Sequence, residues 1–409
     1  MEIRSVTLFS DPEHELAAVA RFFEAAQKQF SFPLQSRRVA FPPFPDWWNE
    51  QEAPASQAEA LLARWQDTGA DYLSLGPVRL DHDARWLRRL PAILAATGAL
   101  FASAEVADIA GHIDGRRCRE VAALIKEASL ISPDGFGNLY FTALANCPPG
   151  SPFFPVAYHA FSGQSGREPA FALALEAADL ALAAFEQAES LQEARQNLVA
   201  AIEAHARELQ EAAEDLARAQ GIAFAGIDFS LAPFPGQSRS LAAAMEALGL
   251  GYTGAPGSLF AAAFITEAID RAQFRRCGFS GLMLPVLEDS VLAQRAAEGR
   301  VTVNDLLGLA AVCGAGLDTI PLPGDIAEEL LAGILLDVAA LATRLRKPLT
   351  ARLMPLPGLA AGDPVHFEFP YFAGSGVMHV ASAGVMGLLA RGERIELFSL
   401  DARRNTHAG

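Results

Sequence analysis

Short apolar runs alternate along most of this chain with longer segments whose apolar residues recur every three or four positions. Runs of four to eight apolar residues bounded by turn-forming residues are typical of buried strands, and the longer period is typical of helices that pack on a sheet. The pattern predicts strands at 3–8, 35–40, 71–75, 99–104, 139–145, 154–160, 223–228, 281–287, 316–320, 350–354 and 365–369. With helices between them, the sequence indicates an α/β fold.

Capping residues mark where these helices should begin. Asp11 and Pro12 supply an N-cap and a first turn for a helix that runs to about residue 29, and Ser56 and Ser190 each begin a capping box. The alanine-rich segment 169–220 is expected to be helical and to link two halves, 1–165 and 222–409, of a single domain spanning 1–409. Other helices are expected at 56–69, 84–97, 116–129, 239–248, 259–276, 290–298, 303–312 and 326–344.

Composition narrows the class of protein. The 409 residues are 51% hydrophobic, enough to bury a large core, and no apolar run is long enough to span a bilayer. Because the first residues enter a strand and not a signal region, we expect a cytoplasmic protein. The net charge of −16 repels phosphate, so neither nucleic acid nor a membrane is an expected partner. The expected partners are a small-molecule ligand and further copies of the chain.

The sequence lacks the residues that several classes of cofactor would need. The four cysteines are widely spaced, which argues against a disulfide scaffold, a structural zinc site or an iron–sulfur cluster. The three lysines, Lys28, Lys126 and Lys347, offer no good candidate for a Schiff base, so pyridoxal phosphate is not expected. Gly314-Ala-Gly316 has no third glycine at the spacing of a dinucleotide fingerprint, so NAD is not expected either.

Acidic residues end several of the apolar runs, namely Asp228, Glu288, Asp289, Asp318 and Asp325. Ligands bind where the carboxyl ends of strands meet, so we expect the first four to share one pocket. Such a group would hold Mg²⁺, Mn²⁺ or Ca²⁺, or would provide carboxylates of different pKa for acid–base catalysis by Asp228 and Asp318. The alternative is structural, because each acid could also cap a helix or a turn.

Three basic residues complete the candidate site. His159, near the end of the strand expected at 154–160, is the candidate acid–base partner, although a histidine in such a place is often a hydrogen-bonded structural group. Arg37 and Arg79 are the candidate substrate-binding residues, since arginines would offset the charge of grouped acids.

Several motifs together resemble one known family. They lie at 226–233 (Gly-Ile-Asp-Phe-Ser-Leu-Ala-Pro), 280–289, 313–318, 323–325 and 382–395, and they look like uncharacterised protein family 0210, also called domain of unknown function 711. The resemblance covers most of the chain. It implies a fold similar to the glycyl-radical enzymes typified by pyruvate formate-lyase, which is a ten-stranded α/β barrel of two antiparallel halves, each a parallel five-stranded sheet.

The radical chemistry of those enzymes is not expected here. The tail reads Ala373-Gly-Ser-Gly-Val-Met378 and lacks the loop that carries the radical glycine. Cys313 falls on a family cysteine position, but its expected role is that of a small buried hydrophobe. Where the family would place a glycine-rich turn this chain has Glu176-Ala-Ala-Asp179, which argues against an anion cradle there and indicates a different ligand.

Two hypotheses of function follow. The first is an enzyme that acts on a small polar metabolite at a carboxylate-rich pocket formed by strand ends, with a divalent cation as the candidate cofactor. The second is a protein without catalytic activity that binds or senses a small ligand, because a fold does not determine a function.

Overall fold

Nine strands form the main ladder of the computed structural model, which describes residues 1–160, 168–381 and 383–401. Two short strands, β5 (His112–Asp114) and β13 (Arg394–Glu396), extend the sheet beside β4. The α/β prediction is confirmed, and strands from both predicted halves share one sheet. The order is β8 (Ala223–Ala232), β7 (Ala170–Glu176), β1 (Glu2–Phe9), β2 (Arg37–Ala40), β3 (Tyr72–Val78), β4 (Leu100–Ala107), β6 (Phe141–Ala145), β10 (Leu349–Leu356) and β9 (Gly316–Pro323).

The strands run in two directions. β1, β2, β3, β4 and β6 are parallel to one another. At one side β7 runs antiparallel to β1 and is followed by a parallel β8, and at the other side β10 runs antiparallel to β6 and is followed by a parallel β9. The amino ends of the five-strand group therefore lie beside the carboxyl ends of the other four strands.

The ladder does not close into a barrel within the described residues, because β8 and β9 are its two edges. Only isolated bridges join the segment 276–285 to those edges, from Ile227 to Arg276 and from Pro285 to Asp318. The strand expected at 281–287 is therefore absent. Pro285 has no amide to donate to a ladder, and Ser280 has a left-handed φ of 41°.

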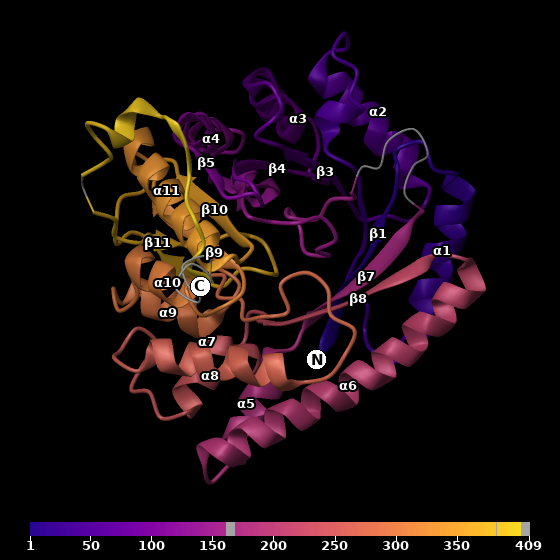
Figure 1. Ribbon diagram of the computed structural model, residues 1–409, viewed down its shortest axis with the longest axis vertical. Helices are drawn as coiled ribbons and strands as arrows, with labels where there is room; N and C mark the ends of the chain where they lie inside the picture. The colour runs from indigo at the N-terminus through magenta and orange to yellow at the C-terminus, as the bar shows by residue number, and fades with distance from the viewer. Residues whose placement is uncertain (161–167, 382, 402–409) are drawn as a thin grey trace, which may run out of the picture.

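Helices surround the sheet, as Figure 1 shows. The longest, α6 (Leu191–Gln220), begins at Ser190, whose hydroxyl accepts the amide of Glu193 at 3.2 Å, and ends at Gly221 with a left-handed φ of 68°. It packs against α1 (Leu16–Gln29), α8 (Ser258–Arg271) and β8. Each fully buried Leu or Ile on its inner face contributes roughly 1.5–3 kcal/mol. These inner residues are Ala194, Leu198, Ile202, Ala206, Leu209, Ala213 and Leu216.

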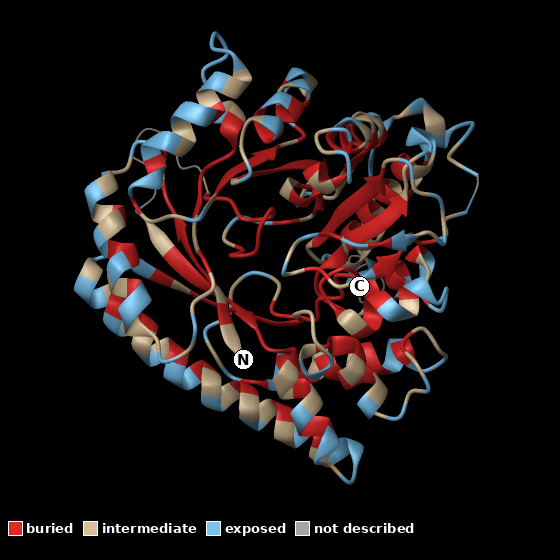
Figure 2. Ribbon diagram, turned by 180° about the vertical axis from the view of Figure 1, so that it is seen from behind, coloured by how far each residue is buried: buried red, intermediate tan, exposed pale blue. Residues whose placement is uncertain are grey.

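The remaining helices follow the predicted pattern closely. In Figure 2 their inner faces and the strands are buried, whereas their outer faces are exposed. None of the helices in the described part of the chain is both long and apolar enough to cross a membrane. They are α2 (Pro54–Gln66), α3 (Leu90–Ala96), α4 (Gly115–Ala128), α5 (Ala178–Glu186), α7 (Leu241–Ala247), α9 (Ser290–Ala297), α10 (Val303–Ala310) and α11 (Glu328–Leu345).

An irregular loop fills part of the concave side of the sheet. The strand expected at 154–160 is not formed. Backbone groups that would pair with a neighbouring strand are instead hydrogen-bonded to side chains or within a turn. Thr7 donates its hydroxyl to the carbonyl of Pro152 at 2.9 Å, and Ser74 donates to the carbonyl of Ala157 at 2.6 Å. The side chain of Phe154 thereby comes to lie against Phe101 of β4, with ring centroids 5.3 Å apart.

Two further expectations are wrong. Residues 170–176 form β7 and not a linking helix, because this small-residue run is buried between β1 and β8, where tertiary pairing overrides the helix preference of alanine. At 365–369 only β11 (Pro364–Val365) is extended, and it pairs with β12 (Ser375–Gly376). The aromatic residues between these two strands cover one side of the site described next.

Candidate functional site

A cavity of about 200 Å³ lies at the amino ends of β2, β3, β4 and β6, beside β10. A larger groove of about 780 Å³ lies between α11 and the segment 379–397, but its lining is mainly aliphatic and includes no arginine or lysine. The smaller cavity combines charged and aromatic side chains and is the candidate site. It is lined by Arg4, Gln35, Ser36, Arg38, Asp71, Tyr72, Gly98, Phe101, Leu139, Tyr140, Phe154, Glu288, Arg352, Phe369 and Tyr371.

A chain of buried charges forms one wall of this cavity. Arg352 of β10 donates from Nη2 to Glu288 Oε1 at 2.9 Å and from Nε to Asp318 Oδ1 of β9 at 2.5 Å. Arg4 of β1 pairs with the other oxygen of Glu288. Burial opposes ionisation of Glu288, but Arg4 and Arg352 outweigh it and lower the pKa of Glu288. Burial raises the pKa of Asp318 more than Arg352 lowers it.

Arg38 of β2 lies in the same cavity but has no carboxylate partner among the described residues. Its Nε donates to the hydroxyl of Ser36 at 2.9 Å, and its guanidinium carbon lies 5.2 Å from the centroid of the Phe154 ring and 5.9 Å from that of Tyr72. Burial, together with the neighbouring charge of Arg4, lowers the pKa of Arg38 to about 9. Arg38 is therefore still a cation at pH 7, and its guanidinium N–H groups could donate hydrogen bonds to a bound anion.

Aromatic rings form the rest of the wall. The ring of Phe101 makes edge contacts with Tyr72 at 5.6 Å and with Tyr140 at 5.1 Å between centroids. Phe369 and Tyr371, from the segment between β11 and β12, contact one another at 5.2 Å. Burial raises the pKa values of Tyr72 and Tyr140, so both phenols stay protonated at neutral pH.

The structure brings two of the four predicted acids together and keeps the other two apart. Glu288 and Asp318 share Arg352, as described above. Asp228 instead accepts the amide of Phe279 at 2.7 Å and that of Ser280 at 2.8 Å. Burial raises the pKa of Asp228 to about 6, against the lowering effect of these hydrogen bonds.

Asp289 caps two helices at once. One carboxylate oxygen accepts the hydroxyl of Ser240 at 2.5 Å and the amides of Val291 and Leu292 at the start of α9, at 3.1 and 3.0 Å. The other oxygen accepts the amides of Leu241 and Ala242 at the start of α7, at 2.7 and 3.0 Å. Five donors therefore surround this buried carboxylate, and its role is structural. Asp325 is exposed in a turn before α11.

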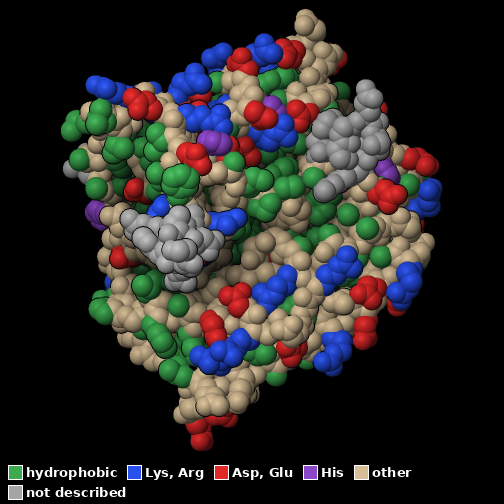
Figure 3. Space-filling model, viewed as in Figure 1, with side chains coloured by type: hydrophobic (Ala, Val, Ile, Leu, Met, Phe, Trp, Pro, Cys, Tyr) green, Lys and Arg blue, Asp and Glu red, His purple; other side chains and the backbone are tan. Residues whose placement is uncertain are grey.

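The predicted basic residues lie elsewhere. His159 donates its amide to the carbonyl of Phe41 at 2.9 Å, and its ring stacks on Phe9 at the far end of β1 from Arg4. Phe9 lies five positions after Arg4 in β1, which is roughly 16 Å along the strand. Arg37 forms an ion pair with Asp71 at 3.0 Å on the rim of the cavity. Figure 3 shows acidic and basic side chains intermingled over the face of the molecule that Figure 1 presents to the viewer.

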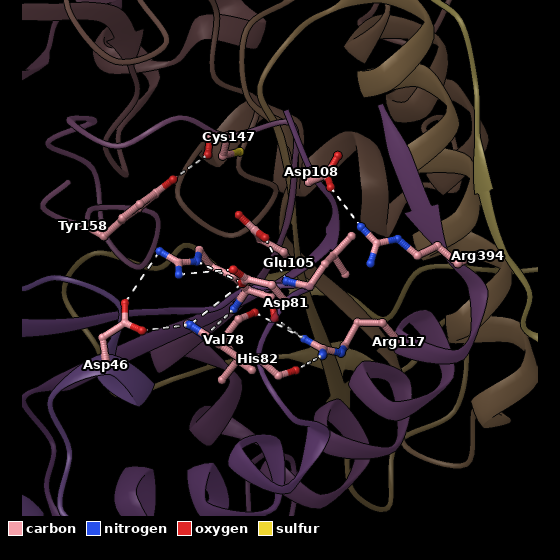
Figure 4. A network of polar contacts seen from close by, with 12 residues as sticks. Asp46, Val78, Asp81, His82, Glu105, Asp108, Arg117, Cys147, Tyr158 and Arg394 are labelled. Carbon is pink, nitrogen blue, oxygen red and sulfur yellow. Dashed lines mark hydrogen bonds and ion pairs between the residues drawn. The ribbon is translucent and has the colours of Figure 1, made fainter. Parts of the chain in front are cut away.

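Arg79 belongs to a second polar network, at the carboxyl ends of β3 and β4 (Figure 4). It pairs with Asp81 at 3.1 Å and with Asp46 at 3.6 Å. Glu105 lies at the centre of this network, and its Oε2 accepts the amide of Leu80 at 3.0 Å. Burial raises the pKa of Glu105 to about 7, although the Leu80 hydrogen bond lowers it in part.

We expect the Glu105→Gln substitution to change how stability depends on pH. The pKa of Glu105 in the folded protein lies above its ordinary value of 4.5, so its stabilising contribution is complete below pH 4.5 and is lost as the pH rises through about 7. Each pKa unit corresponds to about 1.4 kcal/mol, so the variant should gain roughly 3 kcal/mol relative to the wild type between pH 4.5 and pH 8. Urea unfolding across this range measures the difference. The matched change at the exposed Glu127 should leave the two curves parallel, and parallel curves for Glu105→Gln would contradict the expectation.

The positions of the predicted acids and of Cys313 give little support for a metal site or for a reactive thiol. No group of three or more His, Cys, Asp or Glu side chains in residues 1–160, 168–381 and 383–401 is arranged to hold a metal ion. The expected divalent cation would rest on Glu288 and Asp318, whose charges already face Arg352. Cys313 is buried, and burial raises the pKa of its thiol.

Sequence reasoning missed the three arginines of the cavity. Arg352 interrupts the otherwise uncharged strand Leu349–Leu356, and Arg4 lies inside the apolar run of β1. A charged residue is almost never buried without a partner, so an arginine in the middle of a buried strand was the signal available in the sequence. Arg38 differs from its neighbour Arg37 only by facing the other side of the strand.

Comparison with known proteins places this chain in a family. The model of the family described as "Uncharacterised ACR (DUF711)" matches residues 3–371. The chain belongs to the DUF711 family. The expected membership is thus confirmed, whereas the resemblance to pyruvate formate-lyase remains an expectation.

Relatives of this DUF711 protein occur in bacteria and archaea. A UPF0210 protein of Pyrobaculum arsenaticum is 38% identical over 54% of this chain and 50% of its own length, and one of Pyrobaculum aerophilum is 37% identical over 62% and 57%. The chain thus spans little more than half the length of these two relatives. A UPF0210 protein of Clostridium perfringens is 27% identical over 91% of this chain and 85% of its own length. None of these names states a substrate or a reaction.

Proposed function

We propose that this protein binds a small organic anion in the cavity of about 200 Å³, with Arg38 as the residue that contacts the negative charge. The observation that carries the proposal is the lack of a carboxylate partner for Arg38 among the described residues, whereas Arg4 and Arg352 in the same cavity are both paired. Arg38 is half-buried. A partly desolvated cation without a partner costs free energy, and a bound anion would offset that cost.

The low pKa of the acid inside the cavity favours a binding function over catalysis. Two carboxylates border the cavity, Asp71 on the rim, which pairs with Arg37, and Glu288 inside it. Two arginines hold the pKa of Glu288 low, which makes it a weak general base. An enzyme dependent on a divalent cation is the second candidate, favoured by the closeness of Glu288 to Asp318. Under our proposal Mg²⁺, Mn²⁺ and Ca²⁺ leave the melting temperature unchanged. A rise with any of them that is lost in Asp318→Asn would favour the enzyme.

A titration calorimetry experiment tests the role of Arg38. The probes are phenylacetate and cyclohexylacetate, each compared with its neutral amide at pH 7.5. We expect at least one acid to bind more tightly than its amide, and Arg38→Met to weaken that acid by at least tenfold, because a hydrogen bond to a charged group is worth about 1.5–3 kcal/mol.

The controls separate loss of binding from loss of folding. Arg64→Met removes an exposed arginine that pairs with Glu13, and it should leave binding unchanged. Arg38→Met should not lower the melting temperature of the free protein, since it removes a half-buried charge that has no carboxylate partner in the described part of the chain. Amides that bind as well as their acids, or acids that bind Arg38→Met as well as the wild type, would refute the proposal.

A further inference from the structure

Arg38 and the ion-paired group beside it together carry a single positive charge. Arg4, Arg38 and Arg352 supply three cations, and Glu288 and its neighbour on Arg352, Asp318, supply two anions. An anion with one negative charge would therefore neutralise the group. An anion with two negative charges would leave an excess inside a buried site, where uncompensated charge is costly.

The neighbouring charged groups add no further positive charge. Arg37 and Asp71 on the rim neutralise one another at 3.0 Å. On the far side of Arg4, Glu176 and Glu2 share Arg239, at 3.1 and 3.4 Å, and both accept the side-chain amide of Gln35. This group carries one excess negative charge, which adds to the cost of a second negative charge on a ligand. The one cation left without a carboxylate partner around the described cavity is Arg38.

The uncharged wall next to Arg38 consists of ring faces and edges. Tyr72 and Phe154 both lie within 6 Å of its guanidinium carbon, at 5.9 and 5.2 Å, and Phe101 touches both rings, at 5.6 and 5.3 Å between centroids. Offset and edge-to-face ring contacts are worth about 0.5–1.5 kcal/mol each beyond the area that they bury. An aliphatic ligand of the same size would gain the area but not these contacts.

From these two features we propose that the ligand class is a flat aromatic monocarboxylate, whose carboxylate meets Arg38 and whose ring packs among Tyr72, Phe101 and Phe154. This inference rests on the proposed function, because it names the chemical class of the anion bound at that site. The volume of about 200 Å³ suits a ligand with one ring. The phenol hydroxyls of Tyr72, Tyr140 and Tyr371, which make no hydrogen bond to the described part of the chain, remain as partners for further polar groups.

The test compares three probes of similar size by titration calorimetry on the full chain at pH 7.5. Phenylacetate carries a flat ring, cyclohexylacetate carries a puckered aliphatic ring, and phenyl phosphate is a dianion at this pH. We expect phenylacetate to bind about tenfold more tightly than cyclohexylacetate, as two ring contacts would provide. A preference of threefold or more supports the proposal and a smaller one overturns it. Tighter binding of phenyl phosphate than of phenylacetate overturns the assignment of a single charge.

Two substitutions of Tyr72 test whether the preference for phenylacetate over cyclohexylacetate comes from contact with the Tyr72 ring. Tyr72→Leu should reduce the preference for phenylacetate over cyclohexylacetate to less than half its wild-type value, whereas Tyr72→Phe, which keeps the ring, should retain it. Loss of the preference in both variants, or in neither, would contradict the placement of the ring beside Tyr72. If both acids bind equally and both depend on Arg38, the aromatic inference fails and the anion site stands. If neither acid binds more tightly than its amide, the proposed function itself fails.

Discussion

Replacing Arg352 with methionine is expected to lower the free energy of unfolding by about 3–5 kcal/mol. Methionine fills much of the same volume, so the loss comes from charge and not from a cavity. It leaves Asp318 buried without a cation and leaves Glu288 with Arg4 alone. Urea unfolding at pH 7 measures the change, and a loss below 1 kcal/mol would show that water reaches these carboxylates.

A matched control and a rescue variant make this result specific. Arg64→Met removes an exposed ion pair and should cost less than 1 kcal/mol. Adding Asp318→Asn to Arg352→Met removes the stranded charge and keeps the pair of Arg4 with Glu288, so it should recover more than half of the loss. A double variant as unstable as the single one would mean that the geometry of Arg352, and not its charge, holds β9 and β10 together.

Asp289→Ala is expected to lower the free energy of unfolding by about 2–4 kcal/mol, because one capping side chain is worth about 0.5–2 kcal/mol and Asp289 caps two helices. The substitution leaves buried amides at the starts of α7 and α9 without acceptors. Thermal and urea unfolding at pH 7 measure the loss.

The control is the exposed capping residue Asp305, which accepts the amide and hydroxyl of Thr302 at the start of α10. Asp305→Ala removes a cap from one helix at the surface, so it should cost about 1 kcal/mol. Equal losses at Asp289 and Asp305 would contradict the view that the buried carboxylate supports two helices.

The secondary structure could be predicted wherever the residues of a segment were themselves enough to identify it as a strand or a helix. The run 2–9 is apolar enough to be a buried strand, and Ser190 and Gly221 mark the ends of α6. β7 could not be found in this way, since its alanines favour a helix until β1 and β8 lie on either side. The segment 281–287 reads as a strand but makes only the isolated bridge from Pro285 to Asp318 within the described residues, because the positions of β8 and β9 decide what it can pair with.

The site was predictable only in part, for a related reason. An acid at a strand end predicts either a ligand or a cap, and the sequence does not say which amides lie near it. Glu288 and Asp318 meet only because Arg352 comes between them from β10, whereas Asp289 meets the start of α7. The difference depends on contacts between segments far apart in the chain, which local patterns do not contain.

The order of the strands also affects how the chain can mispair during its translation. β6 and β10 are neighbours, yet their pairing joins Ala145 to Leu349, so β6 is synthesised long before its partner exists. During that interval the edge of β6 presents unpaired amide and carbonyl groups, to which a second nascent chain on the same message could add a strand. For this protein the danger of wrong pairing therefore lies in the period of translation, and a chaperone that covered the edge of β6 would act before the final strands leave the ribosome.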